Sequence, residues 1–188
     1  MAGLLDVSQS LTPAPALDRP DLLTPLIVAA LHSQPAVAEH TKVAEIDPDF
    51  ADTVEFCERY SEPLETSANC VIIEGKRAGE VSYAACLVLA HTRIDVNSRA
   101  RKYLNARKAS FAPMDVAVEL TGMEYGGITP IGLPKDWPLL IDSRVVELSK
   151  VVIGSGLRRG KIFISGPALA QLPNADVVTD LAIEIPAA

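Results

Sequence analysis

Short apolar runs bounded by glycine and proline are the main pattern along this chain. Residues 68–73 and 81–90 are almost uninterrupted apolar segments, and the turn-like stretch Gly75-Lys-Arg-Ala-Gly79 lies between them. Runs of this kind are typical of strands buried on both faces, so the pattern predicts a hairpin within a sheet. Further short strands are predicted at residues 108–111, 139–141, 151–153 and 162–164.

Helical patterns precede the predicted hairpin. A short helix is expected at residues 22–31, before Pro35. Asp47-Pro48 is predicted to start a second helix, because aspartate caps helix N-termini and proline suits the first turn. Its spacing predicts Val54, Cys57 and Tyr60 as the buried stripe.

Helices also alternate with the later strands. Asp95 is predicted to cap a basic helix through Leu104, and Pro113 is predicted to open a helix that Gly122 ends. Shorter helical segments are expected at residues 143–148 and 165–172. This order of elements predicts a mixed α/β fold, in which helices pack on a mixed β-sheet.

Composition and charge narrow the functional classes. The chain has 188 residues and a net charge of −7, which predicts one domain and argues against broad nucleic-acid affinity. Basic residues nevertheless gather at positions 93–108 and 158–161. These clusters are either solvated surface or a face that meets phosphate.

Several features of the chain predict a cytoplasmic protein. The three cysteines lack metal-ligand spacing, which predicts reduced thiols and no metal or other cofactor. No apolar run has the length of a membrane span, and the first ten residues do not resemble a secretory signal. Residues 1–20 are predicted to be a flexible leader and residues 21–42 a helical extension, so the main domain is expected at residues 43–188.

Residues 121–134 hold four glycines and two prolines, with apolar residues and two threonines between them. Glycine lets the backbone approach a ligand closely, and proline fixes the backbone. Two interpretations fit this composition, a structural crossover and a ligand-binding loop that presents backbone amides. No nucleophile elbow, Walker loop or dinucleotide fingerprint occurs, and the spacing of Ser155, His91 and Asp142 does not support a catalytic triad.

The segment Gly126-Gly-Ile-Thr-Pro-Ile-Gly132 resembles the glycine/proline signature of the YbaK/ProX family of aminoacyl-tRNA deacylases, a domain also inserted in bacterial prolyl-tRNA synthetases. Arg93-Ile-Asp95, Leu139-Leu-Ile-Asp142 and Gly154-Ser-Gly156 with its following arginines resemble other family segments, in family order. The resemblance covers roughly residues 43 to 182.

The resemblance implies a six- or seven-stranded mixed sheet with flanking helices. It implies trans-editing, in which the ester between a small amino acid and the 3′-terminal adenosine of a misacylated tRNA is hydrolysed. Such editing exists because one methylene changes binding by only about 1–3 kcal/mol. The implied partners are misacylated tRNA and an aminoacyl-tRNA synthetase, with no membrane, and the oligomeric state is left open.

The resemblance, taken with the basic clusters, also assigns candidate site residues. The catalytic candidates are Asn69, Gly126, Gly127 and Thr129. The substrate-binding candidates are Ile128, Pro130, Gly132, Asp142, Gly154, Ser155 and Gly156. The tRNA-binding candidates are Arg99, Arg101, Lys102, Lys108 and Arg158.

Asn69 is the main departure from the family pattern, because it stands where the family usually carries a functional lysine. Asparagine donates hydrogen bonds but brings no positive charge. Three outcomes are open. Asn69 positions the substrate by hydrogen bonding alone, another base such as Lys102 or Lys108 reaches the site, or activity is lost and only binding remains. The last outcome would make the protein a catalytically inactive tRNA- or protein-binding relative.

Overall fold

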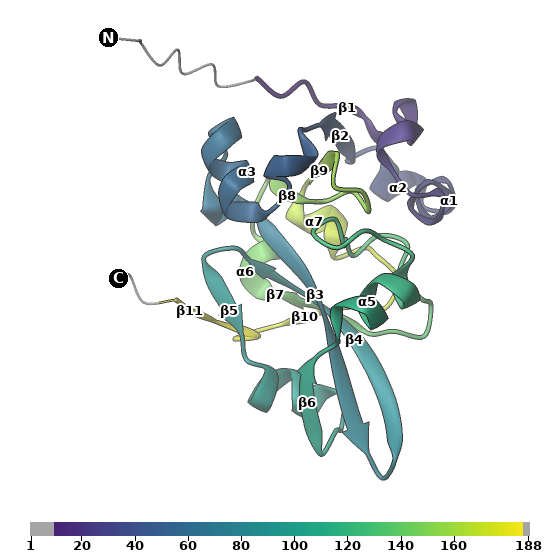
Figure 1. Cartoon of the computed structure of the whole chain (residues 1–188), viewed down its shortest axis with the longest axis vertical. Coiled ribbons are helices and arrows are strands. Elements are labelled where there is room, and N and C mark those ends of the chain that lie inside the picture. Colours follow the sequence, from purple (N-terminus) through teal and green to yellow (C-terminus); the bar gives the residue numbers. More distant parts are fainter. Residues whose placement is uncertain (1–9, 186–188) are drawn as a thin grey trace.

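The computed structural model describes residues 10–185 (Figure 1). Its α-helices are α1 (Pro25–Ser33), α2 (Pro35–Ala38), α3 (Thr53–Tyr60), α4 (Arg101–Tyr103), α5 (Met114–Thr121), α6 (Ser143–Val146) and α7 (Gly166–Leu169). Short 3₁₀ helices are η1 (Ala16–Asp18), η2 (Pro20–Leu22), η3 (Pro48–Phe50) and η4 (Leu64–Thr66), and η5 (Val96–Ala100) is a π-helix.

The strands alternate with these helices along the chain. They are β1 (Ala14–Pro15), β2 (Lys42–Glu45), β3 (Ala68–Arg77), β4 (Glu80–Leu89), β5 (Thr92–Ile94), β6 (Lys108–Phe111), β7 (Leu139–Asp142), β8 (Val151–Gly154), β9 (Gly160–Ile164), β10 (Ala175–Val178) and β11 (Ala182–Glu184). They form sheets in the orders β1-β2-β9-β8, β10-β7-β4-β3-β6 and β11-β5.

The mixed α/β class is therefore confirmed. In the five-stranded sheet β7 pairs parallel with both β4 and β10, whereas β3 pairs antiparallel with β4 and β6. The strands expected of one sheet are divided between a four-stranded and a five-stranded sheet. A parallel bridge between Ser67 and Val152 joins the two.

The predicted hairpin is present, but its turn is shorter than expected. The turn residues Ala78 and Gly79 both have positive φ, 51° and 86°, which suits a two-residue hairpin loop. Gly75, which the sequence places in the turn, pairs with Ser82 within the strands. A Cβ at Gly75 would lie 2.9 Å from the Cβ of Ala106, so this glycine serves close packing rather than chain reversal.

Local capping signals predicted the helix boundaries at Asp95 and Gly122 but not the start of α3. Asp47 caps only the 3₁₀ helix η3, and α3 begins at Thr53. The Asp95 Oδ1 accepts a hydrogen bond from the Ser98 amide at 2.9 Å, although the helix begins as the π-helix η5. Gly122 ends α5 with a φ of 66°. The buried stripe of α3 was wrong at Val54, which is exposed, because the buried residues of this helix are Phe56, Cys57 and Tyr60.

The N-terminal segment packs against the sheet from residue 14 onward, although residues 1–20 were expected to form a flexible leader. Ala14 and Pro15 pair with β2, a strand that the sequence pattern did not predict. Ala16 and Leu22 are buried in the main hydrophobic cluster. Residues 1–9 lie outside the described part of the chain.

The largest hydrophobic cluster lies around β4, β7, β8 and β9 and includes Leu87, Ile141, Ile153 and Ile162. A second cluster lies beneath α3 and contains Phe56, Val152 and Phe163. Because alternate strand residues face opposite sides, β9 sends Ile162 to the first cluster and Phe163 to the second.

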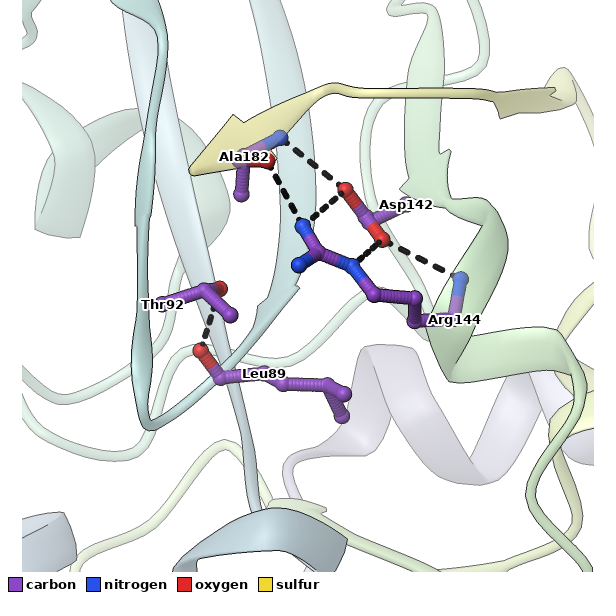
Figure 2. Close-up of polar contacts among 5 residues, drawn as sticks. All are labelled: Leu89, Thr92, Asp142, Arg144 and Ala182. Carbon is purple, nitrogen blue, oxygen red and sulfur yellow. Dashed lines mark hydrogen bonds and ion pairs between the residues drawn. The ribbon is translucent and has the colours of Figure 1, made fainter. Parts of the chain in front are cut away.

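Asp142 connects three parts of the fold at the end of β7 (Figure 2). Its buried carboxylate accepts hydrogen bonds from the Arg144 amide and guanidinium and, at 2.9 Å, from the Ala182 amide of β11. Arg144 also donates to the Ala182 carbonyl at 2.6 Å. Burial alone would raise the pKa of Asp142, but these donors outweigh burial, and the pKa is lowered.

We predict that Asp142→Asn lowers the free energy of unfolding by about 2–3 kcal/mol at about pH 7, because a buried charge partner is removed. A carboxylate with a lowered folded pKa stabilises above its unfolded pKa of about 3.9, and this contribution is lost as pH falls through the folded value. The difference between wild type and variant, measured by urea unfolding, should therefore shrink in acid. The exposed Asp136→Asn is the control, and an equal difference at all pH values would contradict the prediction.

Candidate functional site

A cavity of about 220 Å³ lies where the start of α3 meets the first residues of β3 and the glycine-rich loop. Its wall includes Thr53 of α3, Asn69 of β3, Gly126 and Ile128 of the loop, Gly154 of β8 and Lys161 of β9. Residues distant in sequence thus meet around one small volume.

Close backbone packing holds the glycine-rich loop against the β8–β9 turn. The Gly156 amide donates to the Gly127 carbonyl at 2.7 Å, and the Gly127 amide donates to the Glu124 carbonyl at 2.9 Å. A Cβ on Gly127 would lie 2.9 Å from the backbone carbon of Leu157, and one on Gly154 would lie 2.4 Å from the Gly127 oxygen. No side chain fits at either glycine without moving backbone.

The amides of Gly126 and Ile128 remain available beside the cavity. Neither N–H donates a hydrogen bond to any group within residues 10–185. Gly126 has a φ of 82°, a conformation that favours glycine. The loop therefore presents two backbone donors, a common way to bind a carbonyl oxygen or an oxyanion.

Asn69 is oriented by a neighbour from α3. The Thr53 hydroxyl donates to the Asn69 Oδ1 at 2.6 Å. This bond uses the amide oxygen and leaves the Asn69 NH₂ group as a donor at the cavity wall.

Lys161 is the basic side chain in the cavity wall, and its side chain is largely buried, with the residue only 6% exposed. On β9 it shares a face with Phe163 and points beneath α3, where its ammonium lies 5.2 Å from the centroid of the Phe56 ring. Burial lowers its pKa from 10.5 to about 8, although the neighbouring Cys57 and Asp52 act to raise the pKa. In the sequence, position 161 stands out only as part of the basic cluster at positions 158–161. A lysine in an otherwise apolar strand was the available signal.

The remaining polar side chains of the cavity are poor nucleophiles or already paired. Burial raises the pKa of the Cys70 thiol to about 12, so it stays protonated near neutral pH. Asp52 lies at the rim, where its carboxylate pairs with the Arg158 guanidinium at 3.3 Å. Arg158 also donates to the carbonyl oxygens of Pro48 and Tyr125, which anchors it between the loop and η3.

The sequence profile of the aminoacyl-tRNA editing domain matches residues 47–172. The chain belongs to this family. The resemblance to YbaK/ProX proteins is thereby confirmed. The match spans the cavity wall from α3 to β9, so the cavity lies within the editing domain.

Known proteins agree with this assignment. The chain is 26% identical over 135 residues to the proline–tRNA ligase of Listeria welshimeri, covering 71% of this chain and 22% of that enzyme. The chain thus spans about a fifth of that relative's length. The crystal structure of a proposed trans-editing enzyme for prolyl-tRNA synthetase has the same fold, with a TM-score of 0.68 at 20% identity over 84% of this chain and 97% of the other.

A computationally designed scaffold for presenting linear epitopes also shares the editing-domain fold. Its TM-score is 0.69 at 20% identity, and the match covers 87% of this chain and 100% of the scaffold. At 20% identity, both structures support the assignment of the fold but give no evidence about the activity.

The structure brings four of the predicted site residues together around the cavity of the editing domain: Asn69, Gly126, Ile128 and Gly154. Gly127 and Gly156 hold the loop in place behind them. Gly156 has a φ of 83°, and its backbone packs on Thr24 and Ile27.

Other predicted residues lie elsewhere in the editing domain. Thr129 is fully buried, and its Oγ1 has no hydrogen-bond partner among the described residues. Pro130 and Gly132 line a larger cavity of about 510 Å³ beside α1. Asp142 is engaged by Arg144, and the Ser155 hydroxyl donates to the Leu157 carbonyl at 3.2 Å.

The predicted tRNA-binding residues divide between two regions. Arg101 and Lys102 line an open depression of about 540 Å³ near the β3–β4 turn, together with Arg77 and Arg107. Arg99 pairs with Asp180 at 3.6 Å, and Lys108 is exposed on β6. Arg158 alone of the predicted basic residues stands at the rim of the small cavity, where it pairs with Asp52.

Within residues 10–185, no group of histidine, cysteine or acidic side chains is arranged to hold a metal ion. None of the helices in this part of the chain combines the length and apolarity needed to cross a bilayer.

We predict that Lys161→Met raises the free energy of unfolding by about 2–3 kcal/mol at about pH 7, because it removes a buried ammonium. The folded pKa of Lys161 lies below its ordinary value, so the unfolded chain binds more protons between pH 8 and 10.5. Wild-type stability should therefore rise with pH in this window, and the advantage of the variant should disappear.

Urea unfolding at pH values on both sides of that window would measure this change. Lys42→Met is the matched control, since Lys42 is exposed on β2 of the same sheet. A Lys161→Met protein that is less stable than wild type near neutral pH would contradict the prediction.

Proposed function

We propose that this protein is a trans-editing deacylase, which hydrolyses the ester of a small amino acid wrongly attached to the 3′-terminal adenosine of a tRNA. The observation that carries the proposal is the cavity of about 220 Å³ inside an aminoacyl-tRNA editing domain. Its donors come from the Gly126 and Ile128 amides, the Asn69 amide group and Lys161.

The cavity volume supports a small acyl group. Pockets for drug-sized ligands have about 300–1,000 Å³, which is more than this cavity offers. An aliphatic aminoacyl group of few carbons fits such a volume, whereas a bulky aromatic one would displace the loop. Backbone contacts at Gly127 and Gly154 hold the loop, so a wider cavity would require the backbone to move.

The chemistry of the cavity wall supports hydrolysis by positioning and electrostatic stabilisation. The Cys70 thiol is protonated, so attack by water, assisted by a ribose hydroxyl of the substrate, suits the site better than a protein nucleophile. Attack places negative charge on the carbonyl oxygen, which the available amides would stabilise. Breaking the ester bond then releases the amino acid and returns the proton to the ribose oxygen.

The partner proposed is misacylated tRNA in the cytoplasm, met by the protein alone or beside an aminoacyl-tRNA synthetase. The basic depression formed by Arg101, Lys102 and their neighbours suits contacts with the phosphate backbone. Those contacts would hold the tRNA body and carry no information about the amino acid.

We expect wild-type protein to accelerate ester loss from tRNAs mischarged with small amino acids and to spare tRNAs charged with aromatic ones. The remaining aminoacyl-tRNA, followed over time with and without protein, measures this. Gly127→Val should abolish the acceleration, because its side chain would collide with the Leu157 backbone. Gel filtration and circular dichroism establish that this variant is folded.

The outcomes of this panel separate the two candidate functions. No acceleration with any small amino acid would refute the deacylase. Tight binding of charged tRNA without turnover would favour the catalytically inactive binding relative.

We further expect that replacing Arg99, Arg101 and Lys102 by alanine weakens tRNA binding at low salt. The slope of log K against log salt should fall by about 2–3, because each lost phosphate contact removes close to one released counterion. Fluorescence anisotropy at several salt concentrations measures the slope. A triple alanine variant of Lys42, Lys135 and Lys150 removes the same charge outside this depression. If the two variants have equal salt slopes, the basic depression around Arg101 and Lys102 is not part of the tRNA interface.

A further inference from the structure

We propose that Lys161 is the catalytic cation of the cavity, and that its ammonium donates to the carbonyl oxygen of the aminoacyl ester as negative charge develops there. This inference rests on the proposed function. It assigns to β9 the positive charge that the cavity lacks at Asn69 of β3. Both side chains line the same small cavity, although they lie far apart in the chain.

The surroundings of Lys161 point to a ligand rather than to a structural role. Its ammonium has no hydrogen bond and no ion pair with any group in residues 10–185. The Phe56 ring, 5.2 Å away, provides a cation–π contact, which is weaker than a carboxylate partner. A buried ammonium without such a partner is costly, so a fold that needed only packing would favour an apolar residue here.

Four residues with available donor groups line this small cavity. The Asn69 amide group comes from β3 and is turned by its bond from Thr53. The Gly126 and Ile128 amides come from the loop. Lys161 adds the charge, and a hydrogen bond to an ionised donor is about twice as strong as one between neutral groups.

Because Lys161 lies deep in the cavity, its position determines which part of the substrate can contact it. Lys161 is 6% exposed, whereas the Arg158 and Asp52 side chains at the rim are 31% and 58% exposed. A phosphate of the tRNA end would meet the rim first, and only the small acyl end can enter a cavity of about 220 Å³. The ester carbonyl is the group that lies at this end and gains negative charge in the reaction.

The charge balance requires that Lys161 stays protonated throughout. Attack by water on the carbonyl carbon moves an electron pair onto the carbonyl oxygen. Collapse of this intermediate breaks the bond to the ribose oxygen, which takes up the proton that the attacking water gives up. The titratable groups that face Lys161 are Asp52 and the Cys57 thiol on the α3 side and Arg158 from the β8–β9 turn. With a pKa of about 8, the ammonium form predominates near neutral pH.

The test compares wild type, Lys161→Met and Lys42→Met on the mischarged tRNA that wild type hydrolyses fastest and on the corresponding 3′-aminoacyl adenosine, which lacks phosphate. Lys161→Met should lose about 100-fold in kcat with little change in KM, because the lost contact strengthens in the transition state. The loss should be equal on both substrates, and Lys42→Met should match wild type.

Two further readouts separate a catalytic cation from a packing role. The ratio of wild-type to Lys161→Met kcat/KM should fall as pH rises through about 8, where the ammonium deprotonates. The double variant Asn69→Lys, Lys161→Met should recover at least about 10-fold over Lys161→Met, because it returns a cation to the opposite wall.

Each outcome decides the question. A Lys161→Met protein with wild-type kcat would overturn the role of Lys161 and leave the deacylase standing. A loss confined to the tRNA substrate would show a phosphate contact and would equally overturn it. If wild type hydrolyses no mischarged tRNA, the proposed function fails, and the role of Lys161 fails with it.

Discussion

The site depends on the contact between the glycine-rich loop and the β8–β9 turn. Gly127 and Gly154 bring two backbones so close that a methyl group on either would collide with the other segment. The bond from Gly156 to the Gly127 carbonyl fixes their register. This contact forms one wall of the cavity and limits its volume, and the Gly126 and Ile128 amides beside it donate no hydrogen bond within residues 10–185. A rigid wall also makes selection by size possible, since bulky groups would have to move backbone.

The two buried charges Lys161 and Asp142 have opposite effects on the stability of the fold. The Lys161 ammonium lies beneath α3 with an aromatic ring as its neighbour, and burial lowers its pKa. The Asp142 carboxylate, by contrast, is buried among donors that offset its desolvation. The Asp142 carboxylate joins β7, α6 and β11, whereas the Lys161 ammonium lies at a cavity and forms no hydrogen bond or ion pair with any group in residues 10–185. Groups held at an energetic disadvantage beside a cavity are typical of functional sites.

Local signals explain which elements could be predicted. The β3–β4 hairpin, the Asp95 cap and the Gly122 helix end follow from neighbouring residues, and all three are present. Five strands were missed because they are short and pair only with segments far away in the chain: β1, β2, β5, β10 and β11. Gly75 was assigned to the turn because the pattern shows a glycine and cannot show the Ala106 methyl that packs against it.

The sequence by itself determined the α/β class, the family and the loop that forms the cavity wall, because glycine and proline constrain the backbone wherever they stand. It also predicted that Asn69 stands where the family usually carries a lysine. Only the tertiary structure decided what surrounds Asn69. Pairing of β9 with β8 places Lys161 opposite Gly154, at the same cavity, while Lys102 and Lys108 lie outside its wall. Which charge reaches a site depends on strand pairing between distant segments, and a linear pattern does not contain that pairing.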